Sequence, residues 1–157
     1  MKLDSAGLEI LSRAECLSLL DSVPIGRVAF TARALPAIQP VNFLRDGNTV
    51  VIKTGAGSKL SAATRNTVVA FEADTFDLET KAGWSVVIVG HSSVVTNPTE
   101  ISRLSRLPLQ PWTPAARDHF IRITIEEING RRVPTSVHPA VEPQSQGVPA
   151  SVPAPVP

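Results

Sequence analysis

The sequence predicts a mainly β fold, a six-stranded antiparallel barrel plugged by three short helices. Segments in which apolar and polar residues alternate, or in which β-branched residues predominate, follow one another without regular βαβ crossovers. Two of these segments are joined by Asp46-Gly47-Asn48, and an Asp-Gly pair favours the tight turn of a hairpin. The longest segment contains Gly90, where a strand can bend at a barrel corner. These features favour a barrel over a parallel Rossmann sheet.

The first helix is marked by Ser12 and Glu15, which have the spacing of a capping box. Pro24 is expected to end this helix, because proline cannot donate the backbone hydrogen bond that would continue it. Its apolar face comprises Cys16, Leu19, Leu20 and Val23. A helix with one apolar stripe must pack against another element, so we expect it to cover the barrel.

The remaining elements are assigned from alternation and turn residues. We expect strands over residues 26–31, 37–44, 49–54, 67–73, 84–96 and 117–128. Residues 33–36 are predicted to form a turn, residues 74–81 a polar connection, and Asn129-Gly130 a turn. A second helix is expected over residues 58–66, and a third starts at the Asn97-Pro98 cap.

Composition indicates one ordered domain over residues 1–133. The chain has 157 residues, of which 43% are hydrophobic, enough for a buried core. Residues 134–157 hold seven of the 14 prolines and one charged residue, Glu142. Such a segment cannot bury enough apolar surface to offset its ordering entropy, so we expect a disordered, Pro-rich tail.

Charge and residue usage exclude several classes of protein. The net charge is +1, without the basic stripe expected for binding nucleic acid or an anionic membrane. No apolar run approaches the roughly 20 residues of a membrane span, and we expect a cytoplasmic protein. Cys16 is interpreted as a buried structural thiol. The three histidines and one cysteine lack metal-ligand spacing, so no metal site is predicted.

A candidate phosphate site lies where the strand over residues 49–54 ends. Gly55 and Gly57 let another group approach the backbone closely, and Ser58 can cap the next helix. Lys53 and Lys59 add positive charge beside the free amides. The sequence therefore predicts a phosphate-binding site. The alternative interpretation is a capped helix with solvated lysines.

Pro40 falls inside a predicted strand, although it cannot donate to a β-ladder. We therefore expect Pro40 at a sheet edge, at a bulge, or where a ligand replaces a neighbouring strand. His91 and His119 lie on predicted strands, and a satisfied core histidine is favoured over a catalytic group for each. His91 is expected to face either the barrel or a subunit interface. No general base is assigned from the sequence.

Several short motifs, in order and at familiar spacings, carry a family resemblance. They are Gly26-Arg27-Val28, Gln39-Pro40-Val41-Asn42-Phe43, Lys53-Thr54-Gly55-Ala56-Gly57-Ser58-Lys59-Leu60, Val69-Ala70-Phe71-Glu72-Ala73-Asp74, Gly83-Trp84-Ser85-Val86 and Gly130-Arg131-Arg132. Over residues 12–133 the chain resembles the pyridoxamine 5′-phosphate oxidase-like superfamily. That resemblance implies a split β-barrel of the FMN-binding type.

The resemblance further implies a homodimer that binds FMN, or the deazaflavin F420, at the subunit interface. The cofactor-binding residues that it implies are Pro40, Val41 and Asn42 along the ring, Lys53, Thr54, Ser58 and Lys59 at the phosphate, and Trp84 and Trp112 reaching the partner's cofactor. The implied function is hydride or electron transfer to a small-molecule substrate.

Three function classes follow from these observations. The first is a flavin-dependent oxidoreductase, either FMN-dependent or an F420-dependent reductase. The second is a flavin carrier or sensor without turnover. The third, a protein that has lost the cofactor, is disfavoured by Lys53, Ser58 and Lys59. The substrate-phosphate arginines and the Arg-Leu-x-Pro ending of the true oxidase are missing, which argues against oxidation of vitamin B6.

Overall fold

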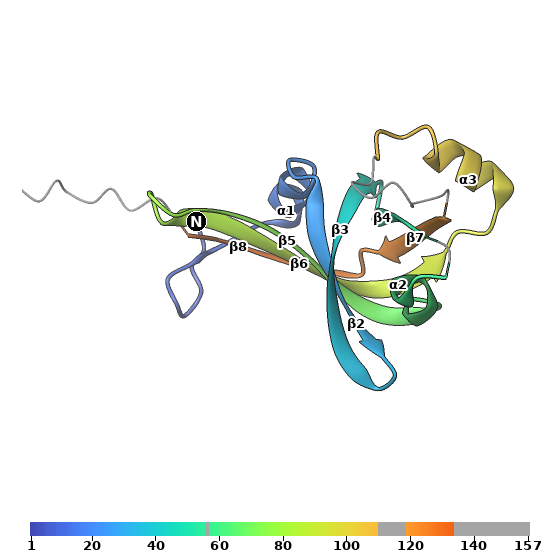
Figure 1. Cartoon of the computed structure of the whole chain (residues 1–157). Coiled ribbons are helices and arrows are strands. Elements are labelled where there is room, and N and C mark those ends of the chain that lie inside the picture. Colours follow the sequence, from blue (N-terminus) through green and yellow to red (C-terminus); the bar gives the residue numbers. More distant parts are fainter. Residues whose placement is uncertain (56, 110–118, 134–157) are drawn as a thin grey trace, which may run out of the picture.

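The computed structural model describes residues 1–55, 57–109 and 119–133 (Figure 1). The elements in chain order are β1 (Glu9–Ile10), α1 (Arg13–Leu20), β2 (Ile25–Ala32), β3 (Leu35–Asp46), β4 (Thr49–Thr54), α2 (Lys59–Ala63), β5 (Thr67–Asp77), β6 (Ala82–Val94), α3 (Pro98–Leu104), β7 (His119–Thr124) and β8 (Glu127–Val133). The predicted tail, residues 134–157, lies outside the described residues, as does Trp112. No described helix combines the length and the apolar character needed to cross a bilayer.

Six of the strands close into an antiparallel barrel. Their order is β6-β5-β2-β3-β4-β7, and pairing of β7 with β6 completes the circle. Strands β8 and β1 extend the sheet beyond β6, and the β5–β6–β8 part projects from the barrel in Figure 1. The predicted six-stranded antiparallel barrel is confirmed, and the two additional strands were not predicted.

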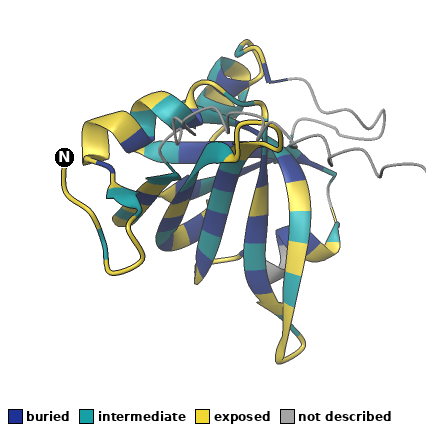
Figure 2. Ribbon diagram, turned by 90° about the vertical axis from the view of Figure 1, so that its left-hand side faces the viewer, coloured by how far each residue is buried: buried dark blue, intermediate teal, exposed yellow. Residues whose placement is uncertain are grey.

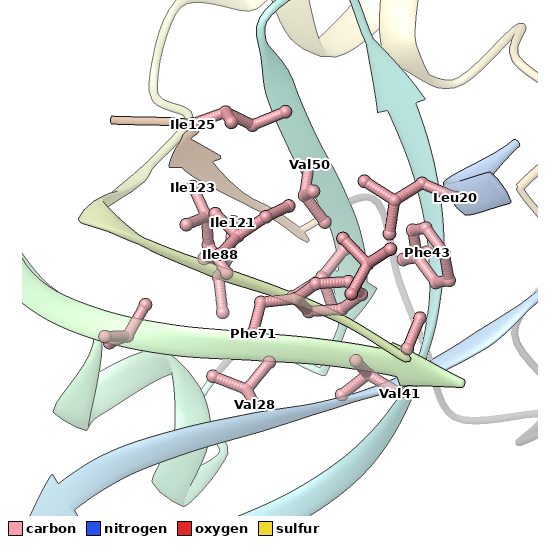
Figure 3. Packing of buried hydrophobic residues seen from close by; sticks show 14 of the residues in the cluster. Leu20, Val28, Val41, Phe43, Val50, Phe71, Ile88, Ile121, Ile123 and Ile125 are labelled. Atoms are coloured by element: carbon pink, nitrogen blue, oxygen red, sulfur yellow. The ribbon is translucent and has the colours of Figure 1, made fainter. Parts of the chain in front are cut away.

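The barrel interior is filled by the side chains that alternation placed on one face of each strand. Phe71, Ile88 and Ile121 are fully buried there, and the Phe43 and Phe71 rings meet edge to face at 4.7 Å (Figure 3). A second, smaller apolar cluster lies between the barrel wall and α3. It comprises Val51, Leu104, Leu109 and Phe120. Because one face of each strand lines the barrel interior, buried and exposed residues alternate along the strands, as Figure 2 shows.

The predicted capping box at the start of α1 is confirmed. The Ser12 hydroxyl accepts from the Glu15 amide, and the Glu15 carboxylate accepts from the Ser12 amide at 2.8 Å. Cys16 is 1% exposed, as predicted for a structural thiol, and burial raises the pKa of that thiol. A Cβ on Gly130 would lie 2.4 Å from the Cys16 sulfur, so glycine lets α1 pack closely on β8.

The prediction of one unbroken last strand, residues 117–128, was wrong. A β-bulge divides this segment into β7 and β8. Ile123 pairs with Ser92, and Glu127 pairs with Val89, so three residues oppose two between these pairs. The chain then continues as β8 along the same neighbour, β6. A Cβ on Gly90 would lie 1.8 Å from the Thr124 carbonyl oxygen, so the bulge requires glycine there.

Three local predictions were also wrong because non-local pairing overrides turn propensity. Asn129 and Gly130 are not a turn but lie within β8, opposite Val87 and Val86. The predicted polar connection is shorter, because β5 continues to Asp77 in its ladder with β6. The turn expected over residues 33–36 is also shorter, since β3 already begins at Leu35. Helix α2 spans Lys59–Ala63 and is shorter than the predicted residues 58–66. The predicted start of α3 at Asn97-Pro98 is confirmed.

An ion network fastens α3 to the barrel. Arg103 binds Asp46, the last residue of β3, at 2.6 Å and Glu100 at 3.0 Å, while Arg122 of β7 binds Glu100 at 2.7 Å. The hydrogen bonds from Arg103 and then Arg122 lower the pKa of Glu100 from 4.5 to about 2. The carboxylate form is thus favoured in the folded chain.

We expect this network to make stability depend on acid pH. Because the folded pKa of Glu100 lies below the unfolded value, its stabilisation is present above about pH 4.5 and is lost as pH falls toward about 2. Thermal melts between pH 6 and pH 2 should therefore show a smaller acid-induced loss for Glu100→Gln than for the wild type. Equal losses over this range would contradict the assigned pKa.

Candidate functional site

The barrel wall opens between β3 and β4. These strands pair from Asp46 opposite Thr49 to Phe43 opposite Ile52, and the pairing stops there. Continued register would set Asn42 opposite Lys53 and Val41 opposite Thr54, but no such pairing forms. Strands β3 and β4 therefore separate at the predicted phosphate-binding site.

The N-terminal part of β3 consequently has an open edge. Among the described strands, residues 35–42 pair with β2 only, with Pro40 opposite Arg27 and Val41 opposite Gly26. The prediction that Pro40 lies at an edge is confirmed. Backbone groups along such an edge can bind a ligand in place of a neighbouring strand.

The loop after β4 holds its polar side chains in a compact arrangement. Gly57 has φ +80°, and the Ser58 amide donates to the Gly55 carbonyl at 3.2 Å. The Ser58 hydroxyl accepts from the Ser61 amide at 3.0 Å and lies 3.1 Å from the Thr54 hydroxyl. Ser58 is thus the predicted N-cap, and it shares a hydrogen bond with Thr54 across the glycine turn.

A second pair of side chains supports this turn and was missed by sequence reasoning. Ser61 is 1% exposed, and its hydroxyl lies 2.6 Å from Nε2 of His119. His119 stands opposite Thr54 in the β4–β7 ladder, so both pairs lie at the same end of the barrel. His119 is half-buried and hydrogen-bonded, as expected of a satisfied histidine. The available signal was Ser61 following the Ser58 cap, but nothing in the sequence links it to a residue 58 positions away.

The two predicted lysines occupy different positions. Successive side chains of a strand point to opposite faces, so Lys53 lies on the opposite face of β4 from Thr54. The Lys53 Nζ lies 5.7 Å from the centroid of the Phe120 ring. Lys59 is exposed at the first position of α2, beside Ser58. With five residues, α2 is too short for a large macrodipole, so local amides and the Lys59 charge provide the positive potential.

A hollow of about 470 Å³ adjoins Ser58 and Lys59. It lies between the β2–β3 hairpin and the start of α2, the elements seen at the bottom and right of Figure 1. Its lining residues are Thr31, Ala32, Arg33, Leu35, Gly57, Ser58 and Lys59. The lining contains two cations and no carboxylate, so it suits an anionic ligand.

The predicted tryptophans do not join this cluster in the described part of one chain. Trp84 lies on β6 between Thr75 of β5 and Arg132 of β8, and it packs half-buried against the barrel core. Trp112 falls outside the described residues. The role predicted for both, contact with a partner's cofactor, stays a prediction.

His91 does not face the barrel, so its interpretation as a core residue was wrong, while the alternative of a subunit interface stays a prediction. Its side chain is 62% exposed, and its Nδ1 lies 2.7 Å from Glu126 at the bulge. The hydrogen bonds from the His91 side chain and amide lower the pKa of Glu126. His91 therefore stabilises the bulge from the outer face of the sheet.

The closed six-stranded antiparallel barrel with few helices defines a class of protein, the split β-barrels. The sequence profile of the pyridoxamine 5′-phosphate oxidase family matches residues 12–132. The chain belongs to this family.

Three proteins illustrate the similarity in sequence and structure. The uncharacterized protein Rv0080 of Mycobacterium tuberculosis is 42% identical over 128 residues, covering 78% of this chain and 84% of that protein. A solved FAD binding protein from Mycobacterium smegmatis is 39% identical, with a TM-score of 0.70, covering 79% of this chain and 97% of the other. A conserved protein of unknown function from Corynebacterium diphtheriae is 34% identical, with a TM-score of 0.67 and coverage of 79% and 96%.

Proposed function

We propose that this chain is a flavin-dependent oxidoreductase that binds the FMN moiety of its cofactor between β3 and β4. The observation that carries the proposal is the parting of these strands beside Thr54 and Ser58. The solved relative from Mycobacterium smegmatis, described as an FAD binding protein, supports a flavin as the ligand. A bound flavin supplies the hydride and electron transfer, and the protein supplies orientation and electrostatics.

The residues around the turn fit a phosphate. The Thr54 and Ser58 hydroxyls and the backbone of the glycine turn can donate hydrogen bonds to it, and Lys59 adds a charge-assisted contact. Lys53, on the other face of β4, contributes positive potential from a greater distance. The phosphate thereby fixes the position of the cofactor relative to the barrel.

The open edge of β3 fits the ring. Pro40 lies on this part of β3, which pairs with β2 and has no ladder with β4. Pro40 has no amide hydrogen, so a ligand leaves no donor unsatisfied at that position. Amides of this edge that point toward the ring would stabilise the negative charge of its reduced state.

We further propose that the protein is a homodimer that places the cofactor between its subunits. The strand registers and the alternation of side chains put Ile38, Val68 and Val87 on one outer sheet face, where they are 70%, 54% and 38% exposed. On the same face Arg27 binds Glu72 and Asp74, each at 3.1 Å. A second copy would cover this apolar surface and surround the ion cluster.

Purification followed by visible spectroscopy and mass analysis of the released ligand tests the proposal. We expect flavin absorption and a dimer by light scattering. Reduction by a nicotinamide or by reduced F420, then reoxidation by a small molecule, would support an oxidoreductase. A bound flavin that neither reductant reduces would instead indicate a carrier. A colourless protein that binds neither added flavin nor F420 would overturn the proposal.

A further inference from the structure

The buried polar side chains in the described part of the chain gather around α2. They belong to Thr54, Ser61, Thr64 and Ser92, each at most 8% exposed, whereas the other buried side chains there are apolar. Helix α2 has five residues, which are too few to form a stable helix in isolation. Its position is therefore set by Leu60, which is fully buried in the barrel core, and by side-chain hydrogen bonds at its two ends.

The C-terminal end of α2 is held by β6. The Ser92 hydroxyl donates to the Thr64 carbonyl at 2.8 Å. The Thr64 hydroxyl in turn donates to the Leu60 carbonyl at 2.7 Å. None of these groups belongs to the proposed phosphate site, so Ser92 stabilises the end of α2 that is farther from the glycine turn.

The N-terminal end of α2 is held by a closed ring of side-chain contacts. The Thr54 and Ser58 hydroxyls lie 3.1 Å apart, and the Ser58 hydroxyl accepts from the Ser61 amide at 3.0 Å. The Ser61 hydroxyl lies 2.6 Å from Nε2 of His119. The ring closes because His119 stands opposite Thr54 in the β4–β7 ladder. His119 thus connects β7 to the turn that carries the proposed phosphate site.

We propose that His119 is a positioning residue for cofactor binding, because its contact with Ser61 holds Ser58 and the turn amides where they bind the phosphate. The inference rests on the proposed function and deepens it, since it identifies a residue that acts on the phosphate site through Ser61. Donors that are fixed before the ligand arrives lose less conformational entropy on binding. Without His119, the Ser61 hydroxyl would be buried without this partner, and the first turn of α2 would rearrange to satisfy it.

Burial argues against a nucleophilic role for the same pair. A serine that a histidine activates must reach its substrate, but Ser61 is 1% exposed. His119 is half-buried, and its Nε2 is already engaged by Ser61. The contact therefore places α2 on the barrel and does not form a catalytic dyad.

The test compares the dissociation constants of FMN and riboflavin for the wild type, His119→Leu and Ser61→Ala. Each substitution should weaken FMN about three- to tenfold and change riboflavin less than about twofold, because only FMN has the phosphate. The double variant should weaken FMN no further than either single variant, since both remove the same contact. His119→Gln, whose side-chain amide can replace Nε2 as the partner of Ser61, should retain most of the affinity for FMN.

Ser92→Ala is the matched control for stability. It removes a buried hydrogen bond from the other end of α2, so we expect a lower melting temperature and an unchanged ratio of FMN to riboflavin affinity. Equal losses for FMN and riboflavin in His119→Leu, an unchanged FMN affinity, or additive losses in the double variant would overturn the positioning role while phosphate binding stands. A wild type that binds FMN no more tightly than riboflavin would instead overturn the phosphate site of the proposed function.

Discussion

Replacing Gly90 with alanine is expected to destabilise the folded chain by at least about 3 kcal/mol. The added Cβ would lie 1.8 Å from the Thr124 carbonyl oxygen and 3.4 Å from the Glu126 amide nitrogen. Both atoms belong to the backbone of the bulge, so no side-chain rotation can relieve the clash. A melting temperature lower by roughly 6–12 °C should be observed by calorimetry.

Gly47→Ala is the matched control for this variant. It adds the same methyl group in the β3–β4 turn, where nothing lies within 4 Å of the new Cβ. Because φ at Gly47 is +61°, we expect a loss of only about 1 kcal/mol. Equal melting temperatures for the two alanine variants would show that the contact between Gly90 and the bulge is not as close as described.

Replacing Lys59 with alanine is expected to weaken FMN binding by about 1.5–3 kcal/mol, or roughly 10- to 150-fold. Lys59 is exposed beside the Ser58 cap and has no carboxylate partner among the described residues. Its removal therefore costs the phosphate contact without freeing a buried charge. Titration followed by quenching of flavin fluorescence measures the change.

Two controls separate a phosphate contact from general damage. Riboflavin has no phosphate, so its affinity should be the same for Lys59→Ala and the wild type. Lys2→Ala removes an exposed charge at the N-terminus and should leave FMN affinity unchanged. An unchanged FMN dissociation constant in Lys59→Ala would place the phosphate elsewhere.

The parts of the fold that depend on neighbouring residues were predictable. The Ser12 and Asn97 caps, the Asp46-Gly47 hairpin and the six barrel strands all follow from local spacing. Strand β8 was missed because Asn129-Gly130 has strong turn propensity. Its ladder with β6, together with the close approach of Cys16 to Gly130, overrides that propensity.

The candidate site was predictable only in the turn after β4, and the contacts that support this turn from other elements were not. Thr54 and Ser58 come together across a short glycine turn. The sequence indicated Ser58 as a helix cap, whereas Thr54 entered the predicted site only through the family resemblance. The alternation of β4 already sets Lys53 on the opposite face from Thr54, and this consequence was not drawn from the sequence. The Ser61 contact with His119 joins α2 to β7 and leaves no local signal in the sequence.

The misplacement of His91 has a specific physical cause. Residues 86–89 are apolar on both faces, which predicted burial on both sides of the strand. In the described chain, the face that carries Val87 and His91 points outward and is exposed. The proposed dimer would account for the apolar character of that face, because a second copy would cover it.

The measurement that tests the central claim most directly is calorimetric titration of the purified wild type with FMN and with riboflavin. Because the claim is that a cofactor phosphate binds beside Thr54, Ser58 and Lys59, FMN should bind at least about tenfold more tightly than riboflavin. Equal affinity for the two flavins would contradict a phosphate site at the opening between β3 and β4.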